Sequence, residues 1–149
     1  MKVAALLASL LLLGGCSGGR PTTEPENDPQ IVRFAQRIDR FYRLLENLPL
    51  DVRLTFDDTA LRGYFNDSEQ FSAYYASLAG QIRRAQFRNS TALRVDIEEF
   101  RFEGDDKAVV VVTLVGRHER ALRVGELEVE RSDTWRLVDG RWMVSPAKL

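Results

Sequence analysis

Residues 133–146, DTWRLVDGRWMVSP, decide the fold of this chain. Their centre, Asp139-Gly140, is typical of a two-residue type I′ turn, in which both turn positions require a positive φ angle. Such a turn joins two antiparallel strands, and its register places four apolar side chains on one face. The expected pairs are Leu137 with Trp142 and Trp135 with Val144.

A further strand is indicated between Thr91 and Phe102, where apolar and polar residues alternate but the apolar positions change parity once. The apolar positions are Leu93, Val95, Ile97, Phe100 and Phe102. One extra residue at Glu98-Glu99 brings both sets onto the same face, which is the signature of a β-bulge. Because bulges bend strands, the sequence predicts a curved sheet.

The next strand follows a turn at residues 104–106 and runs from Ala108 to Val115, with apolar residues at both parities. This run predicts a central strand covered on both faces, or one whose outer face a partner covers. Strands are also expected at residues 118–124 and 126–138. In the second of these, Arg131 and Asp133 share a parity with Leu127, Val129, Trp135 and Leu137.

Amphipathic helices are predicted before the strands. Asp28-Pro29 supplies an N-cap and a first-turn proline, and apolar residues follow at steps of three and four until Pro49. These residues are Ile31, Phe34, Ala35, Ile38, Phe41, Tyr42, Leu45 and Leu48. Residues 52–56 alternate briefly, and Asp57-Asp58 then predicts the cap of a short helix that reaches Phe65.

A second long helix is expected from Asp67, where Gln70 completes a box-like cap, to Asn89-Ser90. Its apolar stripe comprises Phe71, Tyr74, Tyr75, Leu78, Ile82 and Ala85. Gly80 lies inside this helix, where glycine costs about 1 kcal/mol relative to alanine. We therefore expect another element to approach Gly80 closely.

The polar face of the first long helix carries Arg33, Arg37, Arg40 and Arg43. One interpretation is a basic stripe that binds anionic lipid or a polyanionic envelope polymer. The other is an ordinary solvated face, and the overall charge near zero favours this second interpretation.

The N-terminal residues indicate export. Met1-Lys2 is positively charged and residues 3–13 are an apolar run, whose helical rise of about 16 Å is too short to span a bilayer. The following residues 13–16, LGGC, resemble the bacterial lipobox, which implies a signal peptide over residues 1–15 and a lipidated Cys16. Ser17 lacks the aspartate that commonly retains such proteins in the inner membrane, so the resemblance implies the outer membrane, facing the periplasm. The alternatives are a non-lipidated secretory signal or a short anchor with a chance thiol.

Residues 16–29 follow as the lipidated cysteine and a linker, because residues 17–29 hold three prolines, two glycines and no large apolar residue. A single domain is expected over residues 30–149, which suffice for one core. In the 149-residue chain the net charge is −1, so no bulk charge favours nucleic acid as a partner. One cysteine and one histidine exclude an internal disulfide framework and a zinc cage of Cys and His. We predict no metal site, and no cofactor is implied.

The predicted order, with two or three helices before about four antiparallel strands, a bulge and a closing hairpin, resembles the NTF2-like (SnoaL-like, cystatin-like) α+β cone. The resemblance covers residues 30–146 and is most specific in residues 133–146. It implies helices packed on a curved sheet that enclose a pocket open at one end. Enzymes of this class, among them ketosteroid isomerase, polyketide cyclases, dehydratases and epoxide hydrolases, place a buried carboxylate or a His–Asp pair there.

Candidate pocket residues here are Tyr42, Tyr75, Arg131, Asp133, Trp135 and Trp142. The alternative for Arg131 and Asp133 is an ion pair at the rim of the cone, and for the tyrosines it is core packing. The single His118 is expected in an exposed turn. No catalytic motif of the family is matched residue by residue, so no catalytic residue is assigned.

Three functional hypotheses follow. The first is a membrane-anchored envelope lipoprotein whose cone binds a small apolar ligand or an envelope protein without catalysis. The second is a SnoaL-like isomerase, cyclase or hydrolase that uses a buried carboxylate. The third is a structural module that forms a homodimer through the outer face of its sheet. If the side chains of Phe41, Tyr75, Trp135 and Trp142 fill the interior, the hypotheses that place a small molecule there fail together.

Overall fold

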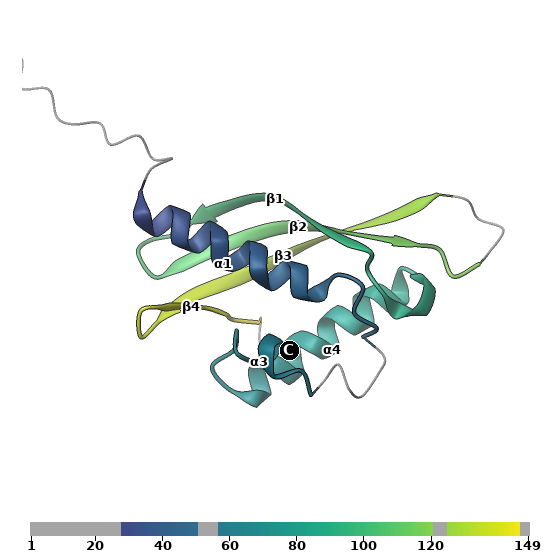
Figure 1. The fold of residues 1–149 in the computed structure, drawn as a ribbon, viewed down its shortest axis with the longest axis horizontal. Helices are drawn as coiled ribbons and strands as arrows, with labels where there is room; N and C mark the ends of the chain where they lie inside the picture. The colour runs from purple at the N-terminus through teal and green to yellow at the C-terminus, as the bar shows by residue number, and fades with distance from the viewer. Residues whose placement is uncertain (1–27, 51–56, 121–124, 147–149) are drawn as a thin grey trace, which may run out of the picture.

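A computed structural model describes residues 28–50, 57–120 and 125–146 of the chain. The elements, in chain order, are α1 (Pro29–Leu45), α3 (Thr59–Arg62), α4 (Ser68–Arg84), a 3₁₀ turn η2 (Arg88–Ser90), β1 (Arg94–Phe102), β2 (Lys107–Arg117), β3 (Glu126–Val138) and β4 (Arg141–Val144). The strands form one antiparallel sheet in the order β1-β2-β3-β4. Figure 1 shows α1 lying across this sheet, with α3 and α4 grouped near the end of β4. The predicted α+β class, helices first, is confirmed.

The closing hairpin has the predicted register. Trp135 pairs with Val144 and Leu137 with Trp142. Asp139 and Gly140 have φ angles of 49° and 75°, as a type I′ turn requires. Both tryptophans are buried against the helices.

The predicted bulge is also present, because the pairing of β1 with β2 shifts between Ile97 and Glu99. After the shift, Phe100 lies opposite Val110 on the face that carries the core. On β2 the inward positions are buried, whereas Val109, Val111 and Thr113 on the outer face are half-buried.

The strand expected at residues 118–124 is wrong for its described part. β2 continues to Arg117, which pairs directly with Glu126, so β2 and β3 are neighbours in one hairpin. His118 forms only an isolated bridge with Phe87. Its ring is buried rather than exposed, and its Nδ1 accepts a hydrogen bond from the backbone N–H of Arg120. Residues 121–124 lie outside the described residues.

Both long helices begin where the sequence predicts. The carboxylates of Asp28 and Asp67 accept hydrogen bonds from the backbone N–H groups of Gln30 and Gln70. The reciprocal half of the predicted capping box is not formed, because Gln70 Oε1 accepts no hydrogen bond from any residue that the structure describes. Asp58 caps α3 through the N–H of Leu61, as expected.

The helices end earlier than predicted. α1 stops at Leu45, before Asn47 takes a positive φ and donates its N–H to the carbonyl of Ala92. α4 stops at Arg84, and the predicted end at Asn89-Ser90 lies in η2. The expected approach of another element to Gly80 is wrong, since an added Cβ would meet only the Arg84 side chain of the same helix. The alternating residues 52–56 lie outside the described residues.

Aromatic side chains fill the space between α1 and the sheet. The ring of Phe41 lies 5.2 Å from that of Trp135, and the ring of Phe34 lies 4.8 Å from that of Trp142. These four side chains are buried, in edge and tilted contacts that favour tight packing. Three of the four residues expected to plug the interior therefore do so, while Tyr75 is half-buried. Aromatic side chains therefore occupy the space between α1 and the sheet where a small apolar ligand was expected.

Candidate functional site

The candidate site is built around Asp133, an acidic residue that the sheet turns toward the core. Asp133 lies opposite Val110 on β2, and its inward parity leaves the residue only 4% exposed. A buried carboxylate is unfavourable unless its oxygens accept hydrogen bonds or meet a positive charge.

Three side chains supply those partners. The hydroxyl groups of Tyr42 on α1 and Tyr74 on α4 both donate to Oδ2 of Asp133, at 3.0 Å and 2.8 Å. Nε of Arg131 donates to Oδ1 at 2.7 Å, in an ion pair whose side chains are 11% and 3% exposed. One carboxylate therefore connects both long helices to β3 with charge-assisted hydrogen bonds.

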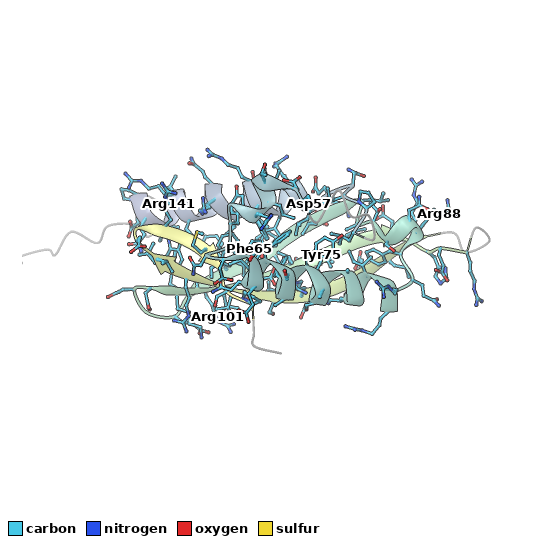
Figure 2. All side chains as sticks on the ribbon, turned by 90° about the horizontal axis from the view of Figure 1, so that it is seen from below. Asp57, Phe65, Tyr75, Arg88, Arg101 and Arg141 are labelled. Carbon is cyan, nitrogen blue, oxygen red and sulfur yellow. The ribbon has the colours of Figure 1, made fainter. Side chains whose placement is uncertain are left out.

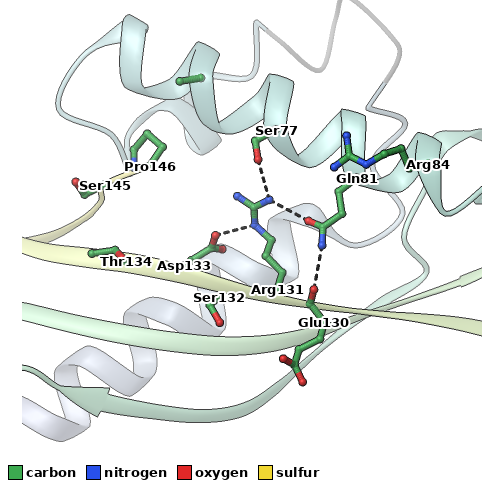
Figure 3. A pocket seen from close by; sticks show the side chains of 11 residues that line it. Ser77, Gln81, Arg84, Glu130, Arg131, Ser132, Asp133, Thr134, Ser145 and Pro146 are labelled. Atoms are coloured by element: carbon green, nitrogen blue, oxygen red, sulfur yellow. Dashed lines mark hydrogen bonds and ion pairs between the residues drawn. The ribbon is translucent and has the colours of Figure 1, made fainter. Parts of the chain in front are cut away.

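Arg131 extends this network to the surface of α4. Its Nη1 donates to Oε1 of Gln81 at 3.1 Å and to Oγ of Ser77 at 3.3 Å (Figure 3). Nε2 of Gln81 in turn donates to the backbone carbonyl of Glu130 at 2.9 Å. The guanidinium carbon of Arg131 also lies 4.5 Å from the centre of the Tyr74 ring, a favourable cation–π distance.

The environment holds these donors in one protonation state. Burial, reinforced by the charge of Asp133, raises the pKa of Tyr42 and of Tyr74 well above the ordinary tyrosine value. For Arg131, burial lowers the pKa, but Tyr74 and Asp133 outweigh it and the net pKa lies above the usual value. At neutral pH both phenols keep their protons and the guanidinium keeps its charge.

This arrangement occupies the Asp133 carboxylate with protein donors rather than preparing it for proton transfer. A general base needs an oxygen within hydrogen-bond reach of a substrate proton. Here both oxygens of Asp133 accept hydrogen bonds from protein donors, and the two phenols that could stabilise an enolate already donate to that carboxylate. The geometry therefore favours a structural role for the network.

A polar hollow of about 430 Å³ lies beside the network, between α4 and β3. Figure 3 shows Ser77, Gln81 and Arg84 on the α4 side and residues 130–134 on the strand side. Hydroxyl, amide and guanidinium groups form about half of this lining, and the rest is apolar; Ser145 and Pro146 lie at the end of the described residues. The hollow can offer hydrogen bonds to a polar ligand.

The structure brings together three of the predicted pocket residues, namely Tyr42, Arg131 and Asp133. Trp135 and Trp142 lie instead in the aromatic core. Tyr75 is not part of the site: its hydroxyl donates to the backbone carbonyl of Leu50.

The residue that sequence reasoning missed is Tyr74, which takes the place expected for Tyr75. Tyr74 lies at the centre of the apolar stripe of α4, in line with Phe71, Leu78 and Ile82, and all four side chains are buried. Tyr75 lies on the flank of this stripe. Ser77 and Gln81, one turn apart on α4, were also missed. The interpretation of Arg131 and Asp133 as a rim pair is wrong for Asp133, which is buried.

Among the described residues, no group of three or more His, Cys, Asp and Glu side chains is arranged to hold a metal ion. Within the same ranges, no helix combines the length and the apolar character needed to cross a membrane. Cys16, the predicted lipidation site, lies outside the described residues.

Comparison with known proteins adds a single structural likeness to these observations. No known family profile and no curated protein matches the chain. Among solved structures, an NTF2-like transpeptidase of Campylobacter jejuni aligns with a TM-score of 0.44 and 14% sequence identity, over 72% of this chain and 95% of that one. The α+β class of this chain rests on its own element order and strand register.

Proposed function

We propose that this chain is a lipid-anchored protein of the bacterial cell envelope whose α+β domain binds a partner without catalysis. The observation that carries the non-catalytic part is the engagement of Asp133 by Tyr42, Tyr74 and Arg131. A carboxylate held in this way stabilises the fold, and the fold in turn presents a binding surface. Each oxygen of the carboxylate already accepts a hydrogen bond from a protein donor.

The anchoring part rests on residues 1–16, an apolar run that ends in the lipobox-like LGGC. Acyl chains on Cys16 would attach the domain firmly, because each buried methylene contributes about 0.8 kcal/mol and two or more chains give stable anchoring. Residues 17–27, which precede the Asp28 cap of α1, would then form a tether that reaches at most about 36 Å. The domain would stay close to the bilayer.

The hollow between α4 and β3 is the binding site that we propose. Its polar lining supports a ligand that forms hydrogen bonds, either a polar small molecule or a peptide segment of an envelope protein. The small apolar ligand expected from the family resemblance is not retained, because aromatic side chains fill the core between α1 and the sheet.

Metabolic labelling tests the anchor. Cells that express the full chain are fed labelled palmitate, and we expect label on the protein and recovery in the membrane fraction. A Cys16→Ala variant controls for labelling at other residues, and it should carry no label. An unlabelled wild-type protein that is released as a soluble product would contradict the proposal.

Substitution in the hollow tests the binding site. Ala73 on α4 lines the hollow and is only half-buried, so Ala73→Arg should block the hollow without disturbing the core. Crosslinking on intact envelopes should capture a partner with the wild type and lose it with Ala73→Arg. The control variant Glu99→Arg, an exposed change on the outer face of β1 opposite Val111, should retain the partner. Equal capture by both variants would remove the hollow from the proposal.

A further inference from the structure

The exposed face of α1 gathers positive charge that the site described above does not use. It carries Arg33, Arg37, Arg40 and Arg43, and Arg141 lies at the start of the neighbouring strand β4. Only Arg43 forms an ion pair among the described residues of this group, with Asp39 one turn earlier. Arg33, Arg40 and Arg141 are exposed and make no ion pair with any described residue.

Arg37 fixes this group of charges to the fold. Its Nε donates to the backbone carbonyl of Trp142, and its guanidinium carbon lies 4.5 Å from the centre of the Tyr64 ring. This contact joins α1 to β4 and holds Arg141 beside the helix.

The positive charges of this group also repel each other. Burial lowers the pKa of Arg37, Tyr64 raises it, and the positive charges of Arg141 and Arg40 lower it further, so that the net pKa is below the usual arginine value. A group of like charges held together in this way is relieved when an anion approaches.

The surroundings of these arginines favour a lipid surface over a soluble polyanion as their ligand. Val32, the large apolar residue most exposed to solvent among the described residues, is 41% exposed and adjoins Arg33 near the start of α1. Figure 2 shows Arg141 toward one end of the molecule and Arg88 at the opposite end. An apolar side chain beside a row of arginines suits a bilayer interface, which offers headgroup charge and hydrocarbon together. A soluble polyanion would offer only charge.

We propose that the α1 basic face, defined as Arg33, Arg37, Arg40 and Arg141, rests on the anionic phospholipid headgroups of the membrane to which the chain is attached. The lipid anchor at Cys16 is part of the proposed function. The present inference rests on that anchor only because the anchor would keep the basic face close to the membrane. A tether of up to about 36 Å exceeds the roughly 26 Å length of α1, so the helix can lie along the surface. Anchoring would raise the effective concentration of headgroups around the face.

The contact can be measured without the anchor. Every residue of the described core lies between Phe34 and Val144, and Asp28 caps α1, so a chain that starts at Asp28 retains the whole described core. This chain lacks Cys16, and its binding to vesicles is therefore independent of lipidation. The palmitate experiment tests the anchor and the vesicle experiment tests the basic face, so a negative result in one leaves the other proposal standing.

The experiment is co-sedimentation with vesicles of phosphatidylcholine, with and without phosphatidylglycerol. Each arginine near an anionic surface changes affinity by about fivefold. The variant Arg33→Gln/Arg40→Gln/Arg141→Gln should therefore bind anionic vesicles roughly one hundredfold more weakly than the wild type. Binding by the wild type should fall as salt is added.

The matched control is Arg83→Gln/Arg88→Gln/Arg117→Gln, which removes the same charge from exposed residues outside the basic face. It should bind anionic vesicles as the wild type does. Equal loss in both triple variants, or equal binding of the wild type to neutral and anionic vesicles, would overturn the proposal. Soluble polyphosphate would also overturn the proposal if it displaced the protein from labelled anionic vesicles as effectively as unlabelled anionic vesicles do. That result would favour a polyanionic polymer as the ligand.

Discussion

The hydroxyl of Tyr74 donates a 2.8 Å hydrogen bond to the carboxylate of Asp133, across a sequence separation of 59 residues. Tyr42 donates to the same oxygen from α1. The two phenols and Arg131 thus hold the sheet and both long helices at one buried point. Loss of a single polar atom at this point would leave buried groups on more than one element without a partner.

Replacing Asp133 by asparagine should destabilise the fold. The variant keeps the shape of the side chain but removes its charge, which leaves Arg131 largely buried without its counter-ion and presents an amide to two hydroxyl donors. Removal of one partner of a buried pair costs about 3–5 kcal/mol. Unfolding by urea, followed by tryptophan fluorescence, measures the change.

Asp96→Asn is the control for Asp133→Asn. It breaks the exposed pair of Asp96 with Arg94, whose side chains are 42% and 50% exposed. Such a pair contributes at most about 1 kcal/mol. An Asp133→Asn protein as stable as the wild type, or more stable, would instead indicate a strained functional site and would count against the non-catalytic proposal.

Removal of single hydroxyl groups should separate the tyrosines. Tyr74→Phe takes a donor from a buried carboxylate, so we expect a loss of about 1.5–3 kcal/mol in the free energy of unfolding. Tyr64→Phe is the matched control, because no described residue forms a hydrogen bond with the Tyr64 hydroxyl and its ring would still face Arg37. Chemical denaturation of both variants gives the comparison, and equal effects would show that the Tyr74 hydrogen bond contributes nothing.

The raised tyrosine pKa values predict alkaline unfolding. In the folded chain the pKa of Tyr42 and of Tyr74 lies well above the ordinary value, so their contribution to stability is fully present below about pH 10. Above that pH the unfolded chain releases both protons first, and the contribution is lost as the pH rises toward the folded pKa values. The free energy of unfolding should fall by up to about 1.4 kcal/mol per pH unit for each tyrosine.

The variant Tyr42→Phe/Tyr74→Phe tests the source of this slope. Its stability is lower at neutral pH, but it should change less between pH 10 and more alkaline conditions, as measured by urea unfolding at each pH. A slope equal to that of the wild type would assign the alkaline sensitivity to other groups.

Local patterns in the sequence predicted the elements whose cause is local. The type I′ turn at Asp139-Gly140, the bulge near Glu99 and the caps at Asp28, Asp58 and Asp67 each depend on a few neighbouring residues, and all are present. The predicted strand at residue 118 failed because periodicity does not show where a strand turns back, which here depends on Arg117 meeting Glu126.

The candidate site was predictable only in part, because it is assembled from distant segments. The parity of β3 placed Asp133 and Arg131 on the inward face, and the α1 stripe placed Tyr42. The choice between Tyr74 and Tyr75 depends on how α4 is rotated against the sheet, and adjacent positions on a helix differ by about 100°. That rotation is set by packing across the whole core.

Dimerisation through the outer face of the sheet stays a prediction.

Replacement of two glycines by alanine should change the stability of the fold in opposite directions. An added Cβ at Gly116 would lie 2.6 Å from Cε2 of the buried Phe87 ring, so Gly116→Ala should destabilise the fold by about 1–3 kcal/mol through overpacking. An added Cβ at Gly80 would lie 3.4 Å from Nη1 of Arg84, the flexible end of a side chain, and alanine gains about 1 kcal/mol over glycine inside a helix. Gly80→Ala should therefore raise the melting temperature and Gly116→Ala should lower it. A raised melting temperature for Gly116→Ala would mean that the contact between β2 and Phe87 does not limit packing there. A lowered melting temperature for Gly80→Ala would mean that the Arg84 side chain does not move aside.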